Sequence, residues 1–202
     1  MKLATFVDPA APAGSRFGIV RDKGMIDVGA AAQALDRHVP APSVKLALAA
    51  GPAVLAALDD LAQAAEQKGL VRPLDTLKFL PPIPDPSKFF CVGKNSRQHR
   101  EELKANKMLT ETPNEPTGFI KLTDTMRGQD AAVARPAGIT TFDYEPELVF
   151  VVGKRAHKVK KADALAHIAG ITVFNDLSMR EIQKREVASG SRFWTAKNAP
   201  GF

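Results

Sequence analysis

The stretch DYEPELVFVV, residues 143–152, decides how this sequence is interpreted. Its apolar half predicts a buried strand, and residues i and i+2 of a strand point to the same face. Glu145 and Glu147 are therefore expected side by side, where each carboxylate raises the pKa of the other. A divalent cation between them removes that penalty, so the stretch predicts part of a metal site. The alternative is an exposed strand edge, because Pro146 has no N–H to donate.

A third carboxylate follows at Asp176, at the end of a predicted strand over residues 171–174. Ser178 and Glu181 have the spacing of a capping box. If Ser178 caps the next helix, which is expected to run to about residue 188, Asp176 is available as a ligand. The alternative is that Asp176 is itself the cap. Three carboxylates would form an all-oxygen site, which suits Mg²⁺, Mn²⁺ or Ca²⁺ and not zinc or copper.

Further polar residues are candidates for handling protons and binding anions. His99 and Glu102 lie three residues apart in a predicted helix over residues 98–106, so their side chains share a face. A carboxylate beside an imidazole raises its basicity, and such a pair could take a proton from water. Lys197 follows aromatic residues and could steady an enolate. Lys121 and Arg180 are candidate anion binders, and the alternative for each of these residues is an ordinary surface position.

The N-terminal part, residues 1–80, is predicted to be a small α+β module. A proline-rich linker over residues 81–87 then excludes both helix and central strand. The remainder, residues 88–202, is rich in short strands, and the whole chain is expected to be α+β. The predicted strands cover residues 2–7, 16–20, 25–28, 88–93, 118–122, 139–152 and 171–174; the predicted helices cover 44–49, 52–68, 98–106, 162–169 and 178–188; 107–116 is a predicted loop.

Composition and charge exclude several classes of protein. Cys91 is the single cysteine, so the chain has no internal disulfide and no cysteine pair of zinc-ligand spacing. Apolar runs are too short to span a membrane, and a cytoplasmic protein is expected. The net charge is +6, and the densest basic run, residues 154–161, is expected to be a solvated loop. Without interleaved aromatic residues it does not predict nucleic-acid binding, whereas attraction of small anionic substrates is consistent with the charge.

Taken in order, the motifs between residues 88 and 202 resemble the fumarylacetoacetate hydrolase family. The resemblance is closest to its bacterial branch of 2-hydroxyhepta-2,4-diene-1,7-dioate isomerases and acylpyruvate hydrolases. Ser96 and Leu122 depart from the family pattern. The matching residues are 91–95, His99, Glu102, 119–121, 143–148, 151–154, 169–173, 175–176, 178–183 and 194–197.

The resemblance implies a mostly β catalytic domain of mixed rolled and layered sheets after the small N-terminal module. It implies metal-dependent hydrolysis, isomerisation or decarboxylation of small anionic oxo-acids in aromatic catabolism, by a homodimer. Family members continue beyond the position of Phe202, so the catalytic domain is expected to be incomplete at its C-terminus. The alternatives are an enzyme similar to ureidoglycolate lyase and an inactive metal-binding relative. The implied roles are Mg²⁺ or Mn²⁺ binding by Glu145, Glu147 and Asp176, proton transfer by His99 with Glu102, enolate stabilisation by Lys197, and substrate binding by Lys121 and Arg180.

Overall fold

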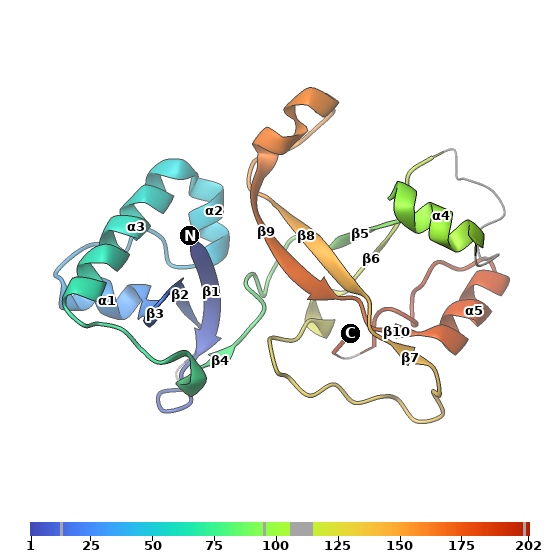
Figure 1. Ribbon diagram of the computed structural model, residues 1–202, viewed down its shortest axis with the longest axis horizontal. Coiled ribbons are helices and arrows are strands. Elements are labelled where there is room, and N and C mark those ends of the chain that lie inside the picture. Colours follow the sequence, from blue (N-terminus) through green and yellow to red (C-terminus); the bar gives the residue numbers. More distant parts are fainter. Residues whose placement is uncertain (13, 95, 106–114, 200) are drawn as a thin grey trace. The chain divides into compact units, whose positions relative to one another are not determined.

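A computed structural model describes residues 1–12, 14–94, 96–105, 115–199 and 201–202 (Figure 1). The chain forms two compact units. The first contains Met1–Asp85, Arg127–Ala132 and Glu145–Asp176, and the second contains Pro86–Met126, Val133–Tyr144 and Leu177–Phe202. Helices and small sheets occur in both, which confirms the α+β class. The rolled and layered arrangement and the domain boundaries at residues 80 and 88 stay predictions.

The N-terminal part of the first unit contains a four-stranded sheet of order β3-β2-β1-β4. All its pairings between described residues are antiparallel. The strand predicted at residues 2–7 and the predicted hairpin are both confirmed. The strands are β1 (Lys2–Val7), β2 (Arg16–Arg21), β3 (Gly24–Asp27) and β4 (Lys78–Phe79).

The described residues of this part also contain a short 3-10 helix, η1 (Leu74–Thr76), and three α-helices, α1 (Val28–Ala34), α2 (Val44–Ala50) and α3 (Pro52–Gln67). The last two are as predicted. Ser43 caps α2 by accepting from the Leu46 N–H at 3.2 Å, and Gly69 follows α3 with a φ of +69°. Helix α1 was not predicted. It begins where a strand was expected to continue, because the Asp27 carboxylate accepts from the Ala30 N–H at 3.1 Å and caps the helix.

The core of this part lies between the sheet and the helices. Phe17 and Ile19 are two residues apart in β2, so they point to the same face. They are 6% and 0% exposed and belong to one cluster with Leu58 and Leu61 of α3. A second cluster, which includes Phe6 and Leu77, forms separately. Apolar side chains therefore form the core of this part, and the buried carboxylates of Asp8 and Asp27 are paired with Arg72 and Arg16.

A two-stranded ribbon, β8 (Pro146–Val152) and β9 (Ile168–Asn175), also belongs to the first unit. Two predictions were wrong here. The strand expected over residues 139–152 is divided, because residues 144–145 separate β8 from β7 (Phe142–Asp143). The segment expected to be a helix over residues 162–169 instead forms a 3-10 helix, η3 (Lys161–His167), and residues 168–169 belong to β9. So short an alanine-rich segment is a marginal helix in isolation, and pairing with β8 supplies hydrogen bonds instead.

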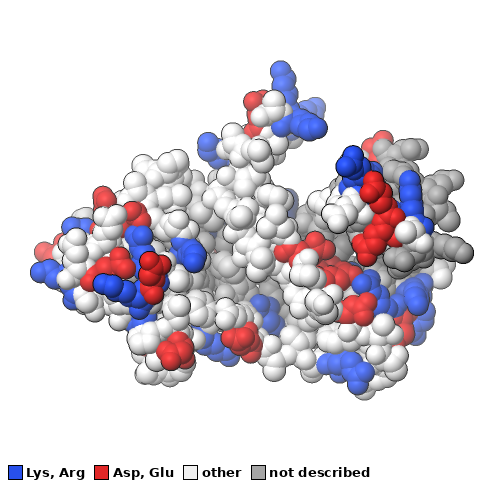
Figure 2. Space-filling model, viewed as in Figure 1, with Lys and Arg blue, Asp and Glu red and all other residues white. Residues whose placement is uncertain are grey.

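The connection between β8 and η3 carries the basic run, residues 154–161. Its lysine and arginine side chains are exposed, and they gather at the tip of the ribbon as blue atoms in Figure 2. The prediction of a solvated loop is confirmed. Below the tip, apolar side chains of the ribbon such as Leu148, Phe150, Ile171 and Val173 are exposed. No helix in the described part of the chain is long and apolar enough to cross a membrane.

The described residues of the second unit form two small antiparallel sheets. One pairs β5 (Phe90–Gly93) with β6 (Thr117–Ile120), and the other pairs β7 with β10 (Ser178–Met179). Ile139, Met179 and Phe202 form its small apolar core. The predicted loop 107–116 lies outside the described residues except for its last two. The remaining elements are α4 (Arg97–Ala105), η2 (Thr123–Thr125) and α5 (Arg180–Ala188).

Candidate functional site

Lys197 is a deeply buried cation of the predicted site. Only 2% of the residue is exposed, and its Nζ donates to Ser178 Oγ at 2.5 Å. The same Nζ lies 5.5 Å from the centre of the Phe119 ring, a distance at which a cation is attracted by the ring face. The site therefore fixes a cationic group in the interior of the second unit.

The loop that carries Lys197 is tied to neighbouring elements through its backbone. The Glu186 carboxylate of α5 accepts from the Thr195 N–H at 2.5 Å and from the Ala196 N–H at 3.3 Å. The Met179 N–H of β10 donates to the Ala196 carbonyl at 3.1 Å. These bonds hold the backbone immediately before Lys197 against β10 and α5.

Asn198 connects the loop to the segment around Lys121. Its Oδ1 accepts from the Leu122 N–H at 2.6 Å, and its Nδ2 donates to the Ile120 carbonyl at 3.2 Å. Lys121 lies between these two residues and is 1% exposed. Asn198 thus places the backbones that carry two buried lysines side by side. Sequence reasoning missed Asn198, because an asparagine after a lysine has no local signature, although an amide can both donate and accept.

Arg180, at the start of α5, is held by two further groups. Its Nε is 2.6 Å from Asp143 Oδ2, and its Nη1 donates to Gln183 Oε1 at 2.9 Å. Since Ser178 pairs with Asp143 in the β10–β7 sheet, Arg180 and Lys197 are anchored to the same two short strands. The structure therefore brings three predicted cations, Lys121, Arg180 and Lys197, into one unit.

The predicted capping box was wrong. Ser178 is in β10, α5 begins two residues later, and within the described residues no side chain caps that helix. Glu181 accepts hydrogen bonds from the Thr140 hydroxyl and from the N–H groups of Thr140 and Thr141. The bond from the Thr140 hydroxyl, followed by those from the backbone N–H groups of Glu181 itself, Thr141 and Thr140, lowers the pKa of Glu181 to about 2. Ser178 therefore gives no reason to regard Asp176 as available for a metal. Asp176 itself lies four residues before α5 and does not start that helix.

The predicted proton-transfer pair falls in α4. Both His99 and Glu102 belong to this helix, as expected, and Glu102 is exposed. The side chain of His99 lies outside what the structure describes. A role for these two residues therefore stays a prediction.

The three predicted metal ligands occur at one end of the β8–β9 ribbon in the first unit. Glu145 lies one residue before β8, so it does not share a strand with Glu147 as expected. The Glu145 N–H donates to Asn175 Oδ1 at 3.0 Å, and the Asp176 N–H donates to the Glu145 carbonyl at 2.8 Å. Asp176 is 3% exposed, whereas Glu147 is exposed. Hydrogen bonds of the backbone thus bring the three residues to the same end of the ribbon. These bonds do not show that the three carboxylates point to one place.

The chemistry of these donors fits a hard cation. Carboxylate oxygens are the ligands that magnesium, manganese and calcium take in proteins. Among the described residues, however, no group of three or more His, Cys, Asp or Glu side chains is arranged as a metal site. The ligand set of Glu145, Glu147 and Asp176 therefore stays a prediction.

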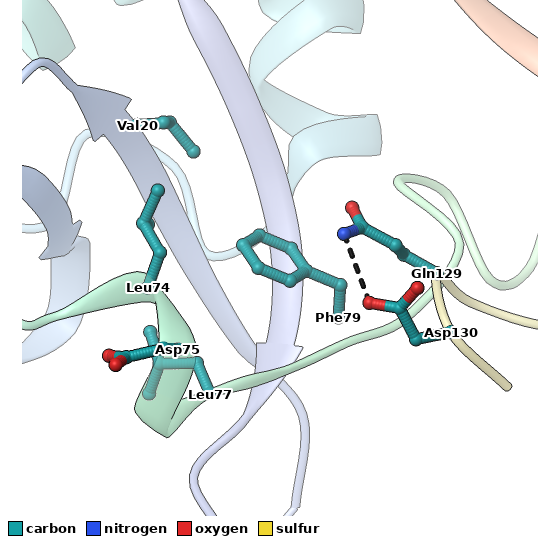
Figure 3. A pocket seen from close by; sticks show the side chains of 7 residues that line it. All are labelled: Val20, Leu74, Asp75, Leu77, Phe79, Gln129 and Asp130. Carbon is teal, nitrogen blue, oxygen red and sulfur yellow. Dashed lines mark hydrogen bonds between the residues drawn. The ribbon is translucent and has the colours of Figure 1, made fainter.

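A cavity of about 430 Å³ in the first unit contains none of the predicted site residues (Figure 3). Phe79 lies between its apolar wall and the pair Gln129–Asp130, which are hydrogen-bonded at 3.2 Å. Two carboxylates, of Asp75 and Asp130, border it, and no cation is among the described residues that line it. A cavity of this kind does not suit an anionic oxo-acid.

Comparison with known proteins identifies the class. The fumarylacetoacetate (FAA) hydrolase C-terminal family matches residues 88–202, which is more than half of the chain. The chain belongs to this family. The resemblance seen in its motifs is therefore confirmed.

Two curated relatives are similar to this chain over about half of its length. The chain is 38% identical over 114 residues to oxaloacetate tautomerase YisK of Bacillus subtilis, covering 55% of this chain and 37% of that protein. It is 38% identical over 111 residues to the homoprotocatechuate catabolism bifunctional isomerase/decarboxylase of Escherichia coli, covering 54% and 25%. The chain thus spans between a quarter and about a third of the length of these two relatives.

A solved structure has the same fold over the whole of this chain. The 2-hydroxyhepta-2,4-diene-1,7-dioate isomerase from Mycobacterium marinum matches with a TM-score of 0.62 and 24% identity. The match covers 100% of this chain and 62% of that one. At this identity the likeness supports the fold and leaves the activity to be argued from the site.

Proposed function

We propose that this chain provides part of the active site of a metal-dependent enzyme that acts on small dioxo- or hydroxy-dienoic acids. The reaction is isomerisation, decarboxylation or hydrolytic C–C cleavage. The observation that carries the proposal is the group of three cations, Lys121, Arg180 and Lys197, held on adjoining segments of the second unit. Burying a cation costs free energy unless the cation is paired or hydrogen-bonded. Buried or partly buried cations gathered in one unit therefore indicate a structural or chemical purpose. The names of the two relatives point to the same class of substrate.

The proposed roles follow from what these side chains offer. Each of the three reactions builds negative charge on an oxygen next to the reacting carbon, and donors aimed at that oxygen lower the barrier. Lys197, which is held by Ser178, would donate to the developing enolate. Arg180 carries a planar guanidinium whose N–H donors suit a carboxylate, and Asp143 and Gln183 hold it in place. It would bind a substrate carboxylate together with Lys121.

Proton transfer is assigned to His99 with Glu102, and a divalent cation to Glu145, Glu147 and Asp176. Mg²⁺ or Mn²⁺, when bound, would supply Lewis-acid polarisation of the substrate oxygens. Glu147 is the exposed member of the carboxylate group, so it is accessible to an incoming ion, whereas Asp176 is held in place by burial. A cytoplasmic homodimer is part of the same proposal, and light scattering would test the dimer.

Turnover of a substrate panel tests the proposed function. The panel contains oxaloacetate, acylpyruvates, a hydroxy-dienedioate and ureidoglycolate, each assayed with Mg²⁺, with Mn²⁺ and after chelation. We expect turnover of an oxo-acid or hydroxy-dienoate that chelation removes. Glu147→Gln should lower it at least about 100-fold, since loss of a charged ligand weakens the metal site. Glu66→Gln on α3 is the matched control and should match the wild type.

The outcomes distinguish the alternatives. Wild-type activity in Glu147→Gln would refute the ligand assignment. Binding of Mn²⁺ without turnover of the panel would favour a non-catalytic metal-binding protein, and turnover of ureidoglycolate alone would favour the lyase.

A further inference from the structure

We propose that Ser178 is the positioning residue that orients Lys197 for its reaction with substrate. The inference rests on the proposed function, because it assigns Lys197 to the developing enolate. Ser178 is fully buried, and its Oγ accepts from Lys197 Nζ. Sequence analysis placed Ser178 in a helix cap, a role that the structure excludes, so its buried hydroxyl needs another explanation.

The first step of the argument is the difference in rigidity between the two residues. Ser178 is in β10, where residues 178 and 179 pair with Asp143 and Phe142 of β7. Lys197 lies in a segment of turns and irregular structure, residues 191–199. A lysine side chain has four rotatable bonds and about 2 kcal/mol of rotamer entropy. A hydroxyl on a paired strand therefore supplies a fixed reference point for an otherwise adaptable cation.

The second step concerns direction. An ammonium group has three donors and no acceptor, so one bond to Ser178 Oγ directs the other two elsewhere. The Phe119 ring, 5.5 Å from Nζ, attracts the cation without using a donor in a conventional hydrogen bond. Preorganised donors accelerate a reaction because they need no rearrangement as charge develops. Ser178 thus contributes to the rate through the direction it imposes on Lys197.

The third step is a comparison with another serine of the same unit. Ser189, at the end of α5, donates its hydroxyl to the Glu186 carbonyl at 2.9 Å and is exposed. Within the described residues, its hydroxyl is bonded to the Glu186 carbonyl and not to a predicted cation. Ser189→Ala is therefore a matched control for Ser178→Ala, because both changes remove one hydroxyl from the same unit.

Steady-state kinetics on the best substrate of the panel provide the first test. Ser178→Ala should lower kcat about 10- to 100-fold, the effect of losing a hydrogen bond to a charged group, and should change KM less than about threefold. Ser178→Thr, which keeps the hydroxyl, should recover most of the lost kcat. Ser189→Ala should leave both constants unchanged. Equal kcat in Ser178→Ala and the wild type, or equal loss in the Ala and Thr variants with native melting temperatures, would overturn the inference.

Nuclear magnetic resonance of the protein labelled with ¹⁵N-lysine gives a second readout that needs no activity. The ammonium signal of Lys197, identified by its loss in Lys197→Met, should shift or disappear in Ser178→Ala, while that of Lys121 stays. An unchanged Lys197 signal in Ser178→Ala would show that Ser178 does not hold Lys197. The absence of a Lys197 signal from the wild-type protein at low temperature would show the same. If the wild type turns over no substrate, the proposed function fails and this readout alone decides the positioning role. The same readout decides it if Ser178→Thr does not fold.

Discussion

The N-terminal part of the first unit and the second unit differ in the charged side chains that they bury, which are the carboxylates of Asp8 and Asp27 in the former and lysines in the latter. In the sheet and helices of the N-terminal part, the largest fully buried residues include Phe6, Ile19 and Leu58, all apolar. In the second unit, Lys121 and Ser178 are buried as completely, and Lys197 nearly so. Burying an apolar side chain stabilises a protein by about 1.5–3 kcal/mol, whereas a buried cation costs free energy unless bonded. The comparison indicates that the first region is stabilised by an apolar core with paired carboxylates, whereas the second unit holds buried positive charge.

The largest expected effect is the loss of activity in Lys197→Met. Removing a donor aimed at a developing oxyanion costs about 100- to 1,000-fold in kcat. Stability should stay the same or rise, because an apolar side chain of similar size replaces a buried cation. Steady-state kinetics and urea unfolding measure the two effects, and Lys184→Met on the exposed side of α5 is the control. A large loss of stability with normal kcat would show that Lys197 serves the stability of the fold and not the reaction.

Leu58→Ala in α3 should have the opposite signature. Leu58 is fully buried in the core against the sheet, so its truncation should lower the free energy of unfolding by about 2–5 kcal/mol. The kcat of the folded protein should not change. Leu46→Ala, at an exposed position of α2, should change stability by less than about 0.5 kcal/mol. Equal effects of the two substitutions in urea unfolding would contradict the core described above.

Asp143→Asn tests the partly exposed edge of the cationic group. Arg180 and Asp143 side chains are 25% and 42% exposed, so the ion pair should contribute at most about 1 kcal/mol to stability. Its loss should reduce kcat/KM about tenfold, since Arg180 would no longer be fixed for a substrate carboxylate. Kinetics with a neutral substrate analogue is the control, because the penalty should shrink when the carboxylate is absent.

The smallest expected effect is a pH dependence of stability. The folded-state pKa of Glu181 is depressed to about 2, below the value of about 4.3 for a free glutamate. Its stabilising contribution is therefore present above about pH 4.3 and is lost as pH falls through about 2. Unfolding midpoints between these pH values should fall less steeply in Glu181→Gln than in the wild type. Identical slopes would show that the hydrogen bonds from Thr140 and Thr141 do not lower the pKa of Glu181.

The comparison of the two regions also explains which structural predictions were correct. Ser43 and Gly69 act within a few residues of their own position, so the ends of α2 and α3 could be predicted. Ser178 and Glu181 have an equally clear local pattern, yet their partners are Lys197 and the backbone near Thr140. Distant partners override a local capping pattern, and the sequence pattern does not specify them.

The candidate site divides in the same way. The residue types and their order identified the family and the cationic candidates Lys121, Arg180 and Lys197, because these depend on composition and spacing alone. Asn198 and the bond between Lys197 and Ser178 emerged from contacts between separate segments, whereas Gln183 contacts Arg180 within α5. The carboxylates illustrate the limit of strand periodicity, since Glu145 lies outside β8 and is bonded instead to Asn175.

The sequence by itself therefore determined the family, the α+β class and the chemical groups available for catalysis. It could do so because hydrophobic period, helix ends and motif order are local properties of the chain. Only the tertiary structure decided where β8 begins, that residues 161–167 form a 3-10 helix, and which hydroxyl holds Lys197. Those features depend on hydrogen bonds between separate segments, such as the bond from Lys197 to Ser178, 19 positions apart, and that from Glu145 to Asn175, 30 positions apart. Such bonds form only when the folded chain brings their partners together.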